Sequence, residues 1–384
     1  MDNKKIKMRI QLDFKITNKM HSLYQSYFSN PPFGVEYFKS EFRGINKRSF
    51  GFFKKVYHLL KNLGFFHQKV IDRLNDSLRK DLNFDLIHFA NHLGKTNKIF
   101  VIDYETVGSF IGTDFHNQKF KNSLIKILNK KNLKFFLPIN KEALKSFKLF
   151  FGDSIKKNQE VIYPVTFIPK KFRKTVNREN LVVFAGSSNI RNEDIFYAKG
   201  GYETLLSFEI LAKKFKNYKF VFIGDIPGNI KISKEENIIL KEVVPIEELY
   251  GILNKSKIFL QPCYSTPAMM FLISRWFKLP IVTYDFWANK EYVNYQNGIL
   301  INPEKTDALK NFNIPMVNKK VINQIKENSK KNSKRIVKAI EKLIKNENLM
   351  KKMGEEGFKL VSEGKFSVEN RNKKILRIYR EALK

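Results

Sequence analysis

The sequence has little cysteine, no long hydrophobic run and few acidic residues relative to basic ones. Cys263 is the one cysteine among 384 residues, which excludes an intramolecular disulfide and a cysteine-rich metal site. No apolar stretch approaches the roughly 20 residues that a membrane-spanning helix requires. The first residues, MDNKKIKMRIQLDF, pass from charge into strand-like alternation and lack the apolar core of a signal peptide. We therefore expect a cytoplasmic protein.

The charge is strongly positive, with a formal net value of +34 and 71 Lys and Arg residues against 37 Asp and Glu residues. Such a balance is compatible with binding to nucleic acid, to an anionic membrane or to an acidic ligand. The abundance of Lys, Asn, Ile and Phe is also typical of coding bias in an AT-rich genome. Lysines are spread along the chain, whereas nucleic-acid readers concentrate arginines. Nucleic-acid binding is thus not expected, and peripheral contact with the inner membrane face is retained as an alternative to coding bias.

Short β-rich runs alternate with helical patterns along most of the chain. The expected strands lie at 8–14, 85–90, 98–104, 133–139, 160–165, 181–186, 218–225, 257–262, 280–285 and 298–303. The expected helices between them include 52–63, 141–152, 201–215, 246–256 and 269–277. This alternation predicts an α/β protein in which parallel sheets are covered by helices on both faces. Each half has enough strands for its own doubly wound, Rossmann-like sheet.

A polar segment without periodicity at 168–180 marks the expected boundary between the halves. We predict an N-terminal domain at 1–170, a second domain at 171–355, and terminal helices at 356–384 that pack back on the first domain. Within the Lys-rich tail, we expect helix stops at Gly354 and at Gly357 or Gly364. Because ligands of open α/β sheets bind beyond the carboxyl ends of the strands, the cleft between the two sheets is the expected site.

The segment AGSSNIRNEDIFYAKGG follows one of these strands and ends at a predicted helix start near Gly201. Gly200 and Gly201 would let the backbone approach a phosphate, and Lys199 would neutralise it. Arg191, in the same loop, could add a bidentate contact. The alternative is a surface loop with ordinary turn glycines. No GxxxxGK[ST] motif is present, so this is not a Walker loop.

The segment PCYSTPAMMFLISRWF contains small residues at a predicted helix start, among them Ser265. Its backbone N–H groups, from Ala268 through Met269 to Met270, would point at whatever occupies the site. This segment contains no Asp or Glu. A plain buried helix with Pro267 in its first turn is the alternative.

Further polar residues follow other strands. Gly224 lies in the turn IGDIPGN, Glu291 belongs to a short helix before the Asn-Gly turn, and Asp103 and Glu105 follow the strand KIFVIDY. Either acidic residue of that pair could act as a base or accept a sugar hydroxyl, although carboxylates at such positions are often caps. The exposed loop PPFG places Gly34 among the residues expected on the acceptor side. The six histidines show no metal-ligand spacing.

The order of these segments resembles the C-terminal domain of family 4 glycosyltransferases, which belong to the GT-B group. The resemblance rests on the strand–glycine–loop–KGG segment, FVFIGD, EELYGILNKSKIFLQPCYS, LPIVTYD and EYVNYQNGILINP. The tail from NENLMKKMGEEG to IYREAL resembles the terminal helices of that family. In the first half, PPFGVEYF, LIHFANHLG and FLPINKEALKSFKLFFG resemble matching segments less sharply.

The resemblance implies a retaining transfer, without a metal or other cofactor, from a nucleotide diphosphate sugar to a glycan or lipid-linked acceptor. Lys199 matches the family lysine and Glu291 matches a family glutamate. Ser187 follows Gly186 where the family has an arginine, which Arg191 would replace. From the residues and the resemblance together, we expect a catalytic set of Lys199, Arg191, Glu291 and Asp103. The expected donor-binding set is Gly186, Ser187, Gly200, Gly224, Ser265, Ala268, Met269 and Met270, and the acceptor-side pair is Gly34 and Glu105.

Two positions depart from the family pattern in the middle of this site. The family has two glutamates eight positions apart where this chain has Ser265 and Ile273. An isoleucine cannot accept hydrogen bonds from ribose hydroxyls, and a serine carries no charge. A catalytically degenerate homologue that binds a glycan, a nucleotide or a partner protein is therefore the alternative hypothesis.

Overall fold

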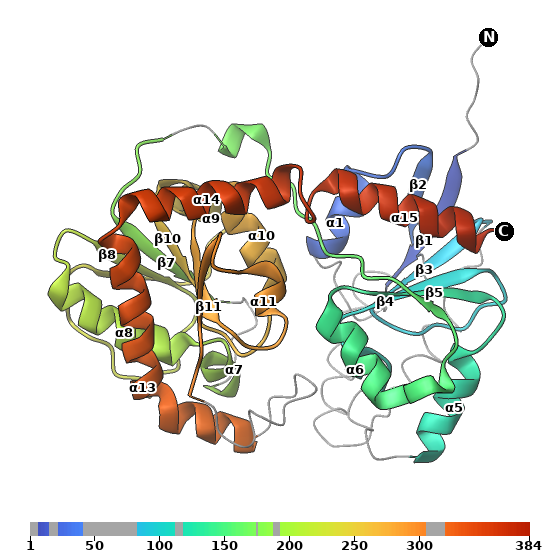
Figure 1. Cartoon of the computed structure of the whole chain (residues 1–384), viewed down its shortest axis with the longest axis horizontal. Helices are drawn as coiled ribbons and strands as arrows, with labels where there is room; N and C mark the ends of the chain where they lie inside the picture. Colours follow the sequence, from blue (N-terminus) through green and yellow to red (C-terminus); the bar gives the residue numbers. More distant parts are fainter. Residues whose placement is uncertain are drawn as a thin grey trace, which may run out of the picture. The chain divides into compact units, whose positions relative to one another are not determined.

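The computed structural model describes residues 7–14, 22–40, 83–111, 118–173, 176–186, 193–304 and 319–384. The chain divides into two compact units, each of which contains one parallel sheet (Figure 1). Unit 1 is Met1–Pro164 with Glu369–Lys384, and unit 2 is Val165–Val368. The helix expected at 52–63, together with Ser187 and Arg191, lies outside the described residues.

Unit 1 contains a six-stranded sheet of order β2-β1-β3-β4-β5-β6 in which all described pairings are parallel. The strands are β1 (Met8–Asp13), β2 (Val35–Lys39), β3 (Leu86–Ala90), β4 (Phe100–Tyr104), β5 (Leu133–Pro138) and β6 (Asn158–Gln159). Its helices are α1 (Ser22–Ser29), α4 (Gly108–Ile111), α5 (Gln118–Leu128), α6 (Lys141–Phe151) and the terminal α15 (Val368–Ala382), with a 3-10 turn at Gly152–Ser154.

Unit 2 contains the second six-stranded parallel sheet, of order β12-β11-β10-β7-β8-β9. Its strands are β7 (Leu181–Ala185), β8 (Lys219–Ile223), β9 (Ile238–Lys241), β10 (Ile258–Leu260), β11 (Ile281–Tyr284) and β12 (Gly298–Ile301). Its helices are α7 (Glu193–Ala198), α8 (Gly201–Lys214), α9 (Ile246–Lys255), α10 (Ala268–Trp276), α11 (Asn289–Tyr292), α13 (Lys319–Ile344) and α14 (Glu347–Ser362), with a 3-10 turn at Lys170–Phe172.

The central strands read as continuous apolar runs because both faces of each sheet are covered. Every residue of β7 is buried, as is every residue of β3 and β4. Parallel sheets need this double cover, since their crossover helices lie on both faces. The predicted α/β architecture with two doubly wound sheets is therefore confirmed.

The terminal helix α15 packs on the first unit, as the sequence predicted. Its buried Arg371 donates hydrogen bonds to the hydroxyl and carbonyl oxygens of Ser26 and to the carbonyl oxygen of Asn30. The same guanidinium lies 4.3 Å from the centre of the Tyr27 ring. These contacts join α15 to the C-terminal half of α1 and to the residue that follows it.

Two expectations about local structure were wrong. The strand predicted at 160–165 is instead Asn158–Gln159. The N–H groups of Glu160 and Ile162 still bond to β5, but Pro164 has no N–H to continue the ladder. Gly354 does not stop a helix, because it lies inside α14. The second stop, expected at Gly357 or Gly364, fits Gly364, since α14 ends at Ser362.

Gly354 instead permits close packing of α14 against the segment that follows α10. A Cβ atom at this position would lie 2.1 Å from the carbonyl oxygen of Lys278. The glycine thus serves helix contact and not helix termination. Among the described residues, no helix combines the length and the apolar character needed to cross a membrane.

Candidate functional site

The connections of unit 2 reverse direction between β7 and β10. The chain runs outward from β7 to β8 and β9, then returns to β10 and runs outward on the other side to β11 and β12. In open parallel sheets the crevice at such a switch point, beyond the carboxyl ends of the strands, is the usual ligand site. The segments that follow β7 and β10 are therefore the ones to examine.

The turn between α7 and α8 approaches the end of β10 closely. Gly200 has a φ of +75°, and a Cβ atom there would lie 1.9 Å from the carbonyl oxygen of Pro262. The amide of Gln261 donates to the carbonyl oxygen of Lys199, and the N–H of Tyr264 donates to that of Ala198. Only glycine fits here, so the KGG sequence serves a backbone contact as well as a helix start.

Lys199 brings a positive charge to this edge of the sheet. Its Nζ donates to the Oγ of Ser265 over 2.9 Å, and both side chains are half-buried. Among the described residues, no carboxylate pairs with this lysine. A half-buried ammonium whose described partner is a neutral hydroxyl can still bind an anion.

The first turn of α10 presents its backbone N–H groups three residues after Ser265. The N–H of Phe271 makes the first intrahelical bond, to the carbonyl oxygen of Pro267. The N–H groups of Ala268, Met269 and Met270 precede that bond and have no acceptor within the helix. These three residues are half-buried, and the helix dipole adds positive potential at this end. One turn further, Ile273 is buried, with an exposed fraction of 6%.

Asn289 connects the next strand end to this loop. Its Nδ2 donates to the carbonyl oxygens of Cys263 and Tyr284 and to the hydroxyl of Thr283. Asn289 begins α11, so it places the neighbouring Glu291 on a helix tied to the loop after β10. Glu291 is half-buried, and its carbonyl oxygen accepts a hydrogen bond from Lys365.

The glycines predicted for donor binding end two adjacent strands. Gly186 follows β7 and its N–H donates to the carbonyl oxygen of Ile223. Gly224 follows β8 with a φ of +141°, and its N–H donates to the carbonyl oxygen of Lys241. The structure thus brings Lys199, Gly200, Ser265 and the start of α10 together, with Gly186 and Gly224 at the same edge of the sheet.

Burial controls the protonation of two groups beside this site. Burial raises the pKa of the Cys263 thiol to about 11, an effect that Lys199 partly opposes. Glu203, in the first turn of α8, is fully buried, and burial raises the pKa of its carboxyl to about 8. Its Oε1 accepts hydrogen bonds of 2.9 Å from the Tyr264 hydroxyl and from the Asn332 amide. Glu203 therefore ties α8 to the loop that carries Ser265.

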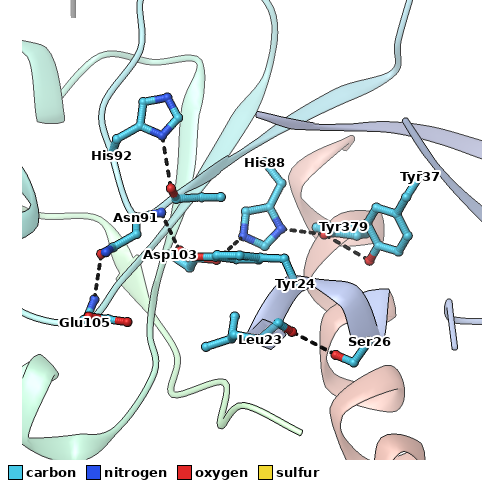
Figure 2. A network of polar contacts seen from close by, with 11 residues as sticks. Leu23, Tyr24, Ser26, Tyr37, His88, Asn91, His92, Asp103, Glu105 and Tyr379 are labelled. Carbon is cyan, nitrogen blue, oxygen red and sulfur yellow. Dashed lines mark hydrogen bonds and ion pairs between the residues drawn. The ribbon is translucent and has the colours of Figure 1, made fainter. Parts of the chain in front are cut away.

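In unit 1, the corresponding switch point lies between β1 and β3. Asp103, drawn in Figure 2, is the penultimate residue of β4, the strand paired with β3. Its exposed fraction is 3%. Its Oδ1 accepts from the Tyr24 hydroxyl and the Asn91 N–H, each over 2.7 Å, and its Oδ2 lies 3.1 Å from Nε2 of His88. These contacts favour a positioning role for Asp103 over the predicted role of a base or of an acceptor of a sugar hydroxyl.

The network continues from Asp103 into the terminal helix. Nδ1 of His88 lies 2.7 Å from the Tyr379 hydroxyl, which accepts a bond from Tyr37 (Figure 2). Burial raises the pKa of Tyr379 and Tyr24, so both hydroxyls stay protonated donors. With Nε2–H donating to the carboxylate, Nδ1 is the acceptor from Tyr379.

Asn91 extends this hydrogen-bond network from Asp103 to Glu105, at the carboxyl end of the sheet. It has a left-handed φ of 55°, and its Oδ1 accepts from the N–H of Glu105 and the hydroxyl of Ser109. Glu105 itself is exposed. A second buried pair, His92 and Asp13, lies at the ends of β3 and β1 with Nε2 and Oδ1 3.1 Å apart. Sequence reasoning assigned no role to Asn91, His88 or Tyr379.

Gly34 does not lie at this end of the sheet. It directly precedes β2, and its carbonyl oxygen accepts from the N–H of Met8, the first residue of β1. It therefore lies at the amino ends of the strands, opposite to Asp103 and Glu105. The expectation that Gly34 lines the acceptor side does not fit its place in a parallel sheet. Within the described part of the chain, no group of three His, Cys, Asp or Glu side chains could hold a metal ion.

No protein-family model and no curated protein matches the sequence. Solved structures do match. A glycosyltransferase from Rickettsia africae ESF-5 superimposes with a TM-score of 0.53 at 14% identity, over 98% of this chain and 99% of that one. Sucrose-phosphate synthase from Thermosynechococcus elongatus gives 0.56 at 11% identity, over 98% and 99% of the two chains. Anabaena HepE, in a complex with UDP and glucose, gives 0.56 at 11% identity, over 97% and 100%.

The chain has the GT-B fold. The three structures named are GT-B glycosyltransferases that match over nearly their whole length. At these identities the likeness establishes the fold and leaves the reaction to be argued from the residues.

Proposed function

We propose that this protein is a glycosyltransferase that takes its sugar from a nucleotide diphosphate donor. The observation that carries the proposal is the ammonium of Lys199 on the Oγ of Ser265, a residue that shortly precedes the N–H groups of α10 that have no acceptor within the helix. Both features lie at the switch point of the unit 2 sheet, where a phosphorylated ligand would be expected.

The chemistry needs such a site because the departing diphosphate gains negative charge as its bond to the sugar breaks. Lys199 and the N–H groups of Ala268 to Met270 would stabilise that charge where it develops. Arg191 and Ser187, outside the described residues, would complete the phosphate contacts, and Glu291 would contact the donor sugar. Gly186, Gly200 and Gly224 would let the ligand approach the backbone.

We also propose that the transfer retains the configuration of the sugar at the anomeric carbon. The bond from that carbon to the phosphate oxygen would break, and the acceptor hydroxyl oxygen would bond to the carbon on the same face. The hydroxyl proton would pass to the departing phosphate oxygen, so no metal or other cofactor is required. The acceptor would be a glycan or a lipid-linked hydroxyl, with Glu105 at the carboxyl end of the unit 1 sheet, organised by Asn91 and Asp103, as its contact.

UDP donors are the first to test, because Anabaena HepE is described in a complex with UDP and glucose. Thermal unfolding of this protein would be measured with UDP-, GDP-, ADP- and dTDP-sugars and the free diphosphates. A ligand at 100 times its Kd stabilises a protein by about 2.7 kcal/mol. Nucleotide release from the stabilising sugar donor would then be measured with Lys199→Met and, as a matched control, Lys213→Met. Lys213 is an exposed lysine of α8 paired with Glu209.

We expect one diphosphate class to stabilise the wild-type and Lys213→Met proteins and to be released from its sugar by both. Lys199→Met should lose most of that stabilisation and turnover. Equal behaviour of the two lysine variants would contradict the site. Binding that depends on Lys199 without any turnover would favour a donor-binding homologue that lacks catalysis, which the serine at 265 and the buried Ile273 make the second candidate.

A further inference from the structure

The outward face of α13 is strongly basic. The helix spans Lys319–Ile344, and its apolar side is buried against the core of unit 2. Its basic residues are Lys319, Lys320, Lys326, Lys330, Lys331, Lys334, Arg335, Lys338 and Lys342, and its acidic residues are Glu327 and Glu341. At 1.5 Å per residue the helix is about 39 Å long.

The half-buried charged residues of α13 form ion pairs with other residues of unit 2. Lys326 pairs with Glu193 over 2.7 Å, and Arg335 pairs with Glu304. Glu341 pairs with Lys214 of α8 over 2.6 Å. These pairs link α13 to neighbouring segments of unit 2 and remain partly exposed to solvent.

The remaining lysines are exposed and form no salt bridge with any residue that the structure describes. They are Lys319, Lys320, Lys330, Lys331, Lys334, Lys338 and Lys342, followed by Lys345 just beyond the helix. Lys330, Lys334, Lys338 and Lys342 are spaced by four residues, so they lie on one side of the helix. Glu327 is the single exposed acidic residue of α13.

Uniform lysine enrichment does not account for this face. In α14, Lys351 pairs with Glu347 and Lys359 pairs with Glu356 along the helix. On α9, Lys255 pairs with Glu179. These lysines of α14 and α9 thus have acidic partners, whereas the exposed lysines of α13 form no salt bridge with any residue that the structure describes.

The composition of the face indicates the kind of partner. Its one arginine, Arg335, is already bound to Glu304 and to the carbonyl oxygen of Asn302. None of the exposed large apolar side chains of the described chain belongs to α13. Nucleic-acid surfaces use arginine forks and aromatic stacking, whereas lysines act as point charges that a flat anionic lipid surface attracts.

We propose that the lysine face of α13 is a contact surface for an anionic membrane. The helix adsorbs through charge, without apolar insertion, and this contact is independent of the donor-site assignment. The buried side of α13 packs against α7 and α8, which Lys199 and Gly200 connect (Figure 1). A membrane contact on α13 therefore lies one helix layer from the donor loop.

The test is sedimentation with vesicles of 30% phosphatidylglycerol in phosphatidylcholine, against pure phosphatidylcholine, at 50 and 300 mM NaCl. The variant replaces Lys330, Lys334, Lys338 and Lys342 by glutamine, which keeps helix propensity. The control variant removes the same charge from four exposed, ion-paired lysines: Lys241, Lys255, Lys351 and Lys373. Circular dichroism and thermal unfolding of all three proteins verify that each variant is folded, and UDP titration checks the donor site separately.

We expect the wild-type protein to bind the phosphatidylglycerol vesicles at low salt and to be released at high salt. The partition constant of the α13 variant should fall by up to about fivefold for each lysine removed. The control variant should fall far less. Equal losses in the two variants, or no preference of the wild-type protein for phosphatidylglycerol, would overturn the proposal. Loss of binding to a 30-base-pair DNA duplex in the α13 variant, with vesicle binding intact, would assign the surface to nucleic acid instead.

Discussion

Glu203 should make the stability of unit 2 fall as pH rises through the neutral range. Burial raises its pKa from an ordinary value of 4.5 to about 8. Below pH 4.5 the carboxyl is protonated in both the folded and unfolded states. Between pH 4.5 and about 8 the folded state retains a proton that the unfolded state has lost, so the free energy of unfolding decreases as pH rises. Above about pH 8 the carboxyl is ionised in both states, so the contribution of Glu203 to the free energy of unfolding no longer changes with pH.

The size of this effect follows from the shift. One pKa unit corresponds to about 1.4 kcal/mol, so the interval between pH 5 and pH 9 should cost up to about 4 kcal/mol. In Glu203→Gln the side chain cannot ionise, and its amide oxygen can still accept from Tyr264 and Asn332. The variant should therefore lack this slope and be more stable than the wild-type protein at pH 9.

The assay is denaturant unfolding followed by tryptophan fluorescence at pH 5, 7 and 9. The two tryptophans of the chain, Trp276 and Trp287, both belong to unit 2, so the signal reports that unit alone. Subtracting the curve of Glu203→Gln removes the pH dependence of the other groups. Parallel pH profiles for the two proteins would refute a buried carboxyl with a raised pKa.

Two further predictions concern the backbone and the buried network. Gly200→Ala should displace the loop after β10, because the new Cβ would lie 1.9 Å from the carbonyl oxygen of Pro262, which precedes Cys263. The buried Cys263 thiol should then react with a thiol reagent. The control Gly251→Ala, whose Cβ meets no atom within 4 Å, should leave the thiol protected. Tyr379→Phe should leave Nδ1 of His88 without its donor and destabilise unit 1 by about 1 to 3 kcal/mol, measured by calorimetry. An unreactive thiol in the first variant, or an unchanged transition in the second, would contradict these assignments.

The central parts of the fold could be predicted from sequence because they obey local rules. Strands such as β7 are buried on both faces and read as apolar runs. The turn at Gly200 was visible because the required backbone conformation selects glycine. The edge strands β2 and β9 were missed, since an edge strand pairs on one side and keeps exposed residues, as both of these do.

The site was predictable only in part, because its partners come from distant segments. The contact of Lys199 with Ser265 joins residues 66 positions apart, and each lay in a motif that could be recognised separately. The contact of His88 with Tyr379 spans 291 positions, and nothing local to either residue indicates the other. The buried contacts of Asp103 with Tyr24 of α1 and with His88 cannot be read from the strand itself.

The central claim is that Lys199 and the start of α10 bind a nucleoside diphosphate. It is tested most directly by calorimetric titration of UDP into the wild-type protein, Lys199→Met and the control Lys213→Met. A hydrogen bond from a charged group contributes about 1.5 to 3 kcal/mol, which corresponds to about a 10- to 150-fold change in Kd. We expect the affinity for UDP to fall by this factor in Lys199→Met and the Kd to stay unchanged in Lys213→Met. The same Kd in all three proteins would contradict it.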